Sequence, residues 1–141
     1  MKFTLPLALG LMFAHPTWAA PSSTLASAKR ILSTLATKPA IAGINNDSRP
    51  CQIKIKKVGG AVSVSADGAT MVIPVSGLRR NSEAKGLNLV TEEGGERSVV
   101  FYETIDGVHT TAIIGLVDGS IKARYVLMNT GEAVYGCSLP E

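Results

Sequence analysis

The chain has 141 residues, with 14 lysine and arginine residues against 11 aspartate and glutamate residues, and an aromatic content of 5%. This length suits one domain with a single hydrophobic core rather than two domains. Because the net charge of +3 is modest and aromatic side chains are few, we exclude nucleic-acid binding and expect no nucleic-acid partner.

The N-terminus has the pattern of a cleaved secretory signal. Lys2 is its only charge, an apolar stretch covers residues 3–14, and Thr17 and Ala19 occupy the positions that a signal peptidase recognises. The apolar stretch is too short to cross a bilayer, so no membrane span is expected. A buried N-terminal helix is the alternative, but two prolines and a glycine interrupt the segment. We therefore predict a signal peptide over residues 1–19, cleavage after Ala19, and a secreted or periplasmic protein.

Residues 20–50 are predicted to form an N-terminal helix and a linker. Ser22 or Ser23 can cap a helix, and Pro39 can end it. Two positive charges are too few for a membrane-surface helix, so the helix is expected to pack on the domain. Residues 39–49 show no hydrophobic period and are interpreted as a linker loop. The apolar face of the predicted helix consists of Leu25, Ala28, Leu32 and Leu35.

From Cys51 onward the hydrophobic period changes to two, which predicts an antiparallel β domain over residues 51–141. Asp-Gly pairs at 67–68, 106–107 and 118–119 separate alternating runs. This dipeptide is a strong signal for a two-residue hairpin loop in which both residues adopt positive φ. Residues 129–131, Asn-Thr-Gly, are expected to form a three-residue loop, and the regular spacing of the turns describes a meander. The predicted strands cover residues 51–58, 61–66, 69–76, 86–91, 97–105, 108–117, 120–128 and 132–138.

These turns also predict which residues lie opposite each other. Two-residue loops place Phe101 opposite Ala112 and Ala112 opposite Tyr125, and the three-residue loop places Tyr125 opposite Tyr135. This register gathers the apolar residues of four successive strands on one face. Because a shift of one residue would destroy that arrangement, the agreement supports the predicted register.

Two cysteines, Cys51 and Cys137, both fall on the predicted core face. In an oxidising compartment they are expected to form a disulfide, which requires Cα atoms within about 7 Å. The first and last predicted strands must therefore come close in space. We predict an all-β fold with one N-terminal helix, in which eight antiparallel strands form a small barrel or a strongly curled sheet, and the helix covers one end or side. A two-sheet β-sandwich is the alternative.

Catalytic chemistry is not expected from this inventory of side chains. One histidine, His109, follows the predicted cleavage site, and it falls on the outer face of a strand without a serine beside it. Paired cysteines are not nucleophiles, and one histidine with scattered acidic residues does not make a metal site. Glu103 falls on the core face opposite Thr110, where a wet position at the rim is the simpler interpretation. We predict a protein that is not an enzyme and has no metal or cofactor.

A basic outer face is the predicted binding surface. If the sheet closes through its first and last strands, Lys54 and Lys56 lie one strand away from Lys122 and Arg124, within about 10 to 15 Å. Such a face would attract an acidic protein or an anionic polymer of the cell envelope, although lysines also decorate solvent-facing strands that bind nothing. The sequence therefore predicts an exported binding or interaction module. The alternative is a carrier that holds a small apolar ligand inside the barrel, where many inward side chains leave little room.

Overall fold

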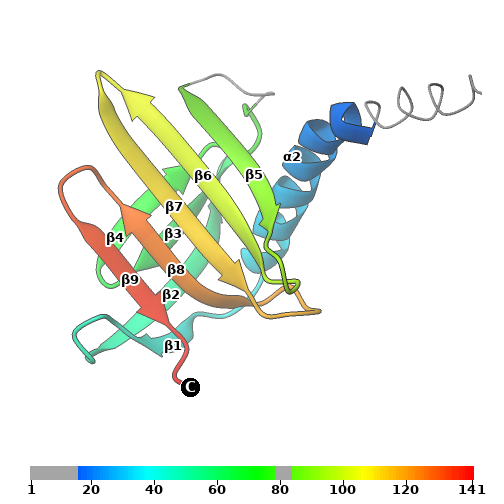
Figure 1. Ribbon diagram of the computed structural model, residues 1–141. Helices are drawn as coiled ribbons and strands as arrows, with labels where there is room; N and C mark the ends of the chain where they lie inside the picture. Colours follow the sequence, from blue (N-terminus) through cyan, green and yellow to red (C-terminus); the bar gives the residue numbers. More distant parts are fainter. Residues whose placement is uncertain (1–15, 79–83) are drawn as a thin grey trace, which may run out of the picture.

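One curled sheet of antiparallel strands forms the body of the protein, and a helix lies beside it (Figure 1). The computed structural model describes residues 16–78 and 84–141, with side chains described from residue 24 onward. The helix is α2 (Pro16–Leu35). The strands are β1 (Ile41–Ile44), β2 (Pro50–Val58), β3 (Ala61–Ala66), β4 (Ala69–Ile73), β5 (Lys85–Thr91), β6 (Arg97–Ile105), β7 (Val108–Leu116), β8 (Ala123–Asn129) and β9 (Val134–Ser138).

The strand order is β4-β3-β2-β1-β9-β8-β7-β6-β5, so β4 and β5 form the two edges of a half-barrel. In Figure 1, β5 to β9 lie in front of β2 to β4. Buried apolar side chains from both halves of the sheet form one core cluster. The structure confirms the predicted all-β fold with an N-terminal helix and a strongly curled sheet. The strands belong to one sheet rather than to the two sheets of a sandwich.

Strand β1 lies in the segment that was expected to be a linker. It pairs with β2 over four residues and with β9 through one residue pair, Ile44 with Ser138. It therefore fills the gap between the predicted first and last strands. Four residues are too few to show a hydrophobic period, so the linker prediction was wrong at this point.

The first two Asp-Gly turns form as predicted. Asp67 and Gly68 have φ of 50° and 83°, and Asp106 and Gly107 have φ of 51° and 79°. Each pair therefore makes a two-residue loop in the left-handed region, which matches the twist of the flanking strands. The register of β6 and β7 follows from the second turn, and Phe101 lies opposite Ala112 as expected.

The third Asp-Gly pair does not form a two-residue loop. Gly119 has a φ of 71°, but Asp118 is not in the positive-φ region that this loop type requires at both positions. The backbone N–H of Val117 instead donates to the carbonyl of Lys122 at 2.9 Å, so four residues lie in the loop. The predicted start of this strand at residue 120 was wrong, and β8 begins at Ala123.

The longer loop, together with a register shift between Gly115 and Leu116, changes which face the residues of β8 occupy. Ala112 lies opposite Met128 rather than opposite Tyr125. Tyr125 was predicted in the core and lies on the outer face instead. The buried residues of β8 are Ala123, Val126 and Met128.

The fourth turn is shorter than expected, because the N–H of Thr130 donates to the carbonyl of Ala133 at 3.1 Å and leaves two residues in the loop. Tyr135 consequently pairs with Met128, not with Tyr125. Tyr135 nevertheless lies on the core face as predicted. Residues that lie opposite each other share a face, and the side chain of Met128 is completely buried in the core.

Helix α2 begins at Pro16, before the predicted cap at Ser22 or Ser23, and ends at Leu35. It lies beside β5, with smaller contacts to β2 and β6, so it covers the open side of the half-barrel (Figure 1). Residues 1–15 of the predicted signal lie outside the described residues. Its last four residues, 16–19, belong to this helix. No helix in the described ranges is long and apolar enough to cross a membrane. The buried helix residues are Ala28, Ile31, Leu32 and Leu35.

Cys51 of β2 and Cys137 of β9 form a disulfide with a Cα–Cα distance of 6.0 Å. Because β1 lies between these strands, the bond crosses β1 on the core side of the sheet. It passes next to Gly43, where a Cβ atom would lie 2.9 Å from the sulfur of Cys137 and 2.5 Å from the carbonyl oxygen of Ser138. A side chain at this position would therefore block the crossing. A buried disulfide fits a protein of an oxidising compartment.

Candidate functional site

The four cations of the predicted basic face do not form two adjacent rows. Lys54 and Lys56 lie on the outer face of β2 as expected. Arg124 lies on β8 and Lys122 in the loop before it, and both β1 and β9 separate these strands from β2. The expectation that one strand separates the two pairs was wrong, because the unexpected strand β1 is inserted between them.

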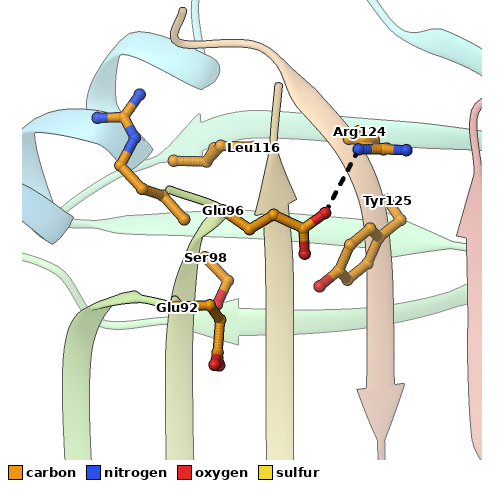
Figure 2. A pocket seen from close by; sticks show the side chains of 7 residues that line it. Glu92, Glu96, Ser98, Leu116, Arg124 and Tyr125 are labelled. Carbon is orange, nitrogen blue, oxygen red and sulfur yellow. Dashed lines mark ion pairs between the residues drawn. The ribbon is translucent and has the colours of Figure 1, made fainter. Parts of the chain in front are cut away.

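Arg124 is also engaged by an acidic partner (Figure 2). Its Nη1 atom lies 3.7 Å from Oε1 of Glu96, and both side chains are more than half exposed. A pair this exposed contributes little stability, but it reduces the positive field at Arg124. The hollow around the pair has a volume of about 50 Å³, far below that of typical ligand sites. It is lined by Glu92, Glu96, Arg97, Ser98, Leu116, Arg124 and Tyr125.

Glu103 occupies the position that the register predicted, opposite Thr110. Its carboxylate lies 2.9 Å from Nζ of Lys85 on the neighbouring strand, and its side chain is 26% exposed. This is a hydrated rim position with an ion-pair partner that the sequence analysis did not identify. His109 is exposed, and its Nδ1 atom shares a 2.8 Å hydrogen bond with the hydroxyl of Thr104. In the described ranges, no group of three or more histidine, cysteine or acidic side chains has the arrangement of a metal site.

A groove of about 550 Å³ lies between the end of α2, the start of β1 and the loop between β7 and β8. We call it the end groove. The segments that form it are far apart in the sequence, and the curled sheet brings them together. Its lining residues are Thr34, Lys38, Pro39, Ile41, Ser120, Ile121, Lys122 and Ala123.

The C-terminal end of α2 and the residues that follow it form one wall of the end groove. The N–H groups of Thr37 and Lys38 donate to the carbonyls of Thr34 and Leu35, which closes the last turn. Pro39 cannot continue a helix, so the chain turns away there and enters β1. This geometry brings Lys38 and Pro39 next to Ile41 at the mouth of the sheet.

The opposite wall depends on the four-residue loop before β8. The predicted two-residue turn would have placed Ile121 in the strand ladder opposite Leu116. In the longer loop, Ile121 leaves the ladder, packs partly against the core and lines the groove with Lys122. The same loop geometry that moved Tyr125 to the outer face therefore also forms this wall.

The chemistry of the end groove is apolar with a positive rim. Pro39, Ile41, Ile121 and Ala123 provide apolar surface, and the charged residues among the described lining residues are two lysines, Lys38 and Lys122. In the described part of the chain, neither ammonium group forms an ion pair. The arrangement therefore suits a ligand with an apolar body and an anionic group. Lys122 was a predicted binding residue, but no sequence motif indicated the others.

Comparisons with models of protein families, with curated proteins and with solved structures find no match to this chain.

Proposed function

We propose that the protein is an exported, non-enzymatic binding module that holds a single-chain carboxylate amphiphile, such as a fatty acid, in the end groove. The observation that carries this proposal is an apolar groove of about 550 Å³ in which Lys38 and Lys122 are the charged groups among the described lining residues. This volume falls within the range of small-molecule sites, roughly 300 to 1,000 Å³. The apolar surface accepts the alkyl chain and the lysines accept the carboxylate.

The alkyl chain supplies most of the expected affinity. Each buried methylene group contributes about 0.8 kcal/mol, whereas an exposed ion pair contributes about 0.2 to 1 kcal/mol. The two lysines therefore determine the orientation and the preference for an anion more than the overall affinity. The absence of carboxylate, histidine and cysteine side chains among the described lining residues supports binding rather than catalysis.

A ligand inside the half-barrel has less support, because core side chains occupy that space. Leu87, Phe101, Ile114 and Met128 are each at most 1% exposed there. An acidic protein or an anionic polymer bound through Lys54, Lys56, Lys122 and Arg124 is also less favoured, since two strands separate these cations. The disulfide supports export to the periplasm or beyond, with residues 1–19 as the signal.

Isothermal titration of the purified protein with dodecanoate tests the proposal. We expect binding at one site, weaker binding of dodecanol, and the weakest binding of dodecyltrimethylammonium, because these ligands share a chain and differ in charge. The double variant Lys38→Glu/Lys122→Glu is expected to bind dodecanoate about tenfold more weakly, since two charge reversals at about 0.7 kcal/mol each correspond to that factor.

The matched control is Lys54→Glu/Lys56→Glu, which makes the same change in net charge on the outer face of β2. We expect it to bind dodecanoate as the unmodified protein does. If dodecanoate does not bind, or if both double variants lose affinity equally, the end groove is not a site for an anionic amphiphile.

A further inference from the structure

The outer face of β5 to β9 carries no charged side chain over three consecutive cross-strand rows. The register places these residues opposite one another, and the alternate residues on the same strands, such as Leu87, Phe101 and Ile114, are buried in the core. We call this surface the neutral face. Its rows are Gly86, Tyr102, Thr111, Asn129 and Val134; Asn88, Val100, Ile113, Leu127 and Gly136; and Val90, Ser98, Gly115, Tyr125 and Ser138.

This lack of charge is local to one half of the sheet. Charged residues make up 18% of the chain, and the outer face of β2 carries Lys54 and Lys56. Figure 1 looks onto the neutral face, which no described helix or strand covers. Eleven of its fifteen residues are at least partly exposed to water, but the surface lacks the charges that usually keep an exposed sheet soluble.

Two tyrosine rings lie across neighbouring strands on this face. Tyr102 is paired with Gly86, and Tyr125 is paired with Gly115. A Cβ atom at either glycine would collide with the ring of its partner, so each ring rests on the backbone where a side chain is missing. Figure 2 shows the ring of Tyr125 pointing from β8 toward β7. Both tyrosines are partly exposed, so part of each remains accessible to a ligand.

The two rings stand at opposite ends of an uncharged strip. Because Tyr102 extends to β5 and Tyr125 to β7, the rings are two strands and four residues apart, which corresponds to about 16 Å. Val100 and Ile113 form the apolar surface between them, and the amide of Asn88 lies beside Val100 in the same row.

We propose that the neutral face binds a neutral polysaccharide of β-linked pyranose rings, with Tyr102 and Tyr125 as the stacking residues. A pyranose with equatorial hydroxyl groups has an apolar C–H face, which packs on the negative face of an aromatic ring, and a rim of hydroxyl groups for amide and hydroxyl side chains. A short oligosaccharide of a few pyranose rings is long enough to bridge the distance between the two tyrosines. The three uncharged rows favour a neutral polymer over an anionic one, and charged side chains of the described residues occur only at the end of the strip, where Glu92, Glu96 and Arg124 lie beside Tyr125.

A second copy of the chain is a poorer occupant of this surface. Five strands and three rows cover roughly 24 by 20 Å, or about 480 Å², whereas a stable interface buries about 800 Å² on each partner. The face is also the convex side of a half-barrel, so two copies would touch over an even smaller area. A flexible polymer can follow this curvature.

Affinity electrophoresis of the purified, disulfide-bonded protein tests the proposal. We expect hydroxyethylcellulose in the gel to retard the protein, and carboxymethylcellulose, which has the same backbone but negative charges, to retard it less. Titration with cellohexaose and chitohexaose should show which ring substituents are accepted. Tyr102→Ala and Tyr125→Ala are each expected to weaken binding at least tenfold, whereas Tyr102→Phe and Tyr125→Phe should retain it because the ring remains.

Two further variants keep the test decisive if the alanine variants are unstable. Val100→Lys places a charge between the rings without removing either, and should also weaken binding at least tenfold. Lys54→Ser, on the outer face of β2, should leave binding unchanged. The proposal is wrong if neither polymer nor hexasaccharide binds, or if the alanine variants bind equally well. It is also wrong if the protein is a dimer that Tyr125→Ala dissociates, because the face is then a protein interface.

Discussion

Removing the disulfide is the perturbation whose effect the structure defines best. Cys51 and Cys137 are 86 residues apart in the sequence, so the bond restricts most of the unfolded chain. On the loop-entropy relation, a closure of this length contributes about 4.6 kcal/mol to the free energy of unfolding at 25 °C. A domain of about 120 residues has an unfolding entropy near 0.25 kcal/mol/K, so the melting temperature should fall by about 18 °C.

The measurement is thermal unfolding of the Cys51→Ala/Cys137→Ala variant and of the unmodified protein, each with and without dithiothreitol. Reduction should lower the melting temperature of the unmodified protein almost to that of the variant, and should not affect the variant. Free-thiol labelling of the native protein should detect no reactive cysteine. A shift below about 4 °C, equivalent to about 1 kcal/mol, would show that the bond does not constrain the unfolded chain as described.

Two further predictions concern the path of the disulfide and the N-terminus. Gly43→Ala should lower the free energy of unfolding by about 1 to 3 kcal/mol, because its Cβ atom meets the Cys137 sulfur and the Ser138 carbonyl. Gly77→Ala is the matched control, since a Cβ atom there meets nothing within 4 Å; equal stability of the two variants in urea would contradict the crossing at Gly43. Export with cleavage after Ala19 predicts that the intact mass of the secreted protein corresponds to a chain starting at Ala20. A full-length cytoplasmic product would contradict both the signal and the proposed compartment.

The sequence alone determined the fold class and the faces of the early strands. In β2, Cys51, Ile53 and Ile55 alternate with polar residues, and these three residues are the buried ones. Because side chains of a strand point alternately to its two faces, this pattern determines which face is turned to the core. The turns at Asp67-Gly68 and Asp106-Gly107 formed as expected, since this dipeptide tolerates positive φ at both positions. Both cysteines were correctly placed on the core face, and this placement predicted the disulfide.

The end groove could not be predicted from the sequence pattern. Lys38, Ile41 and Ile121 show no shared motif, and contact between their segments requires the whole sheet to curl. The neutral face could not be predicted for a related reason. The ring of Tyr125 lies over Gly115 only in the observed register of β7 and β8, whereas the predicted turns placed Tyr125 opposite Ala112.

Tertiary structure decided the third turn and the insertion of β1. An Asp-Gly pair permits a two-residue loop but does not enforce one, so packing of Ile121 against the core and the shift at Gly115 determined the length. Strand β1 has four residues and too few side chains to specify a period, and its place between β2 and β9 follows from contacts that are distant in sequence. Local residues determine the conformations available to a turn or a short strand, and the energy of the completed core selects among them.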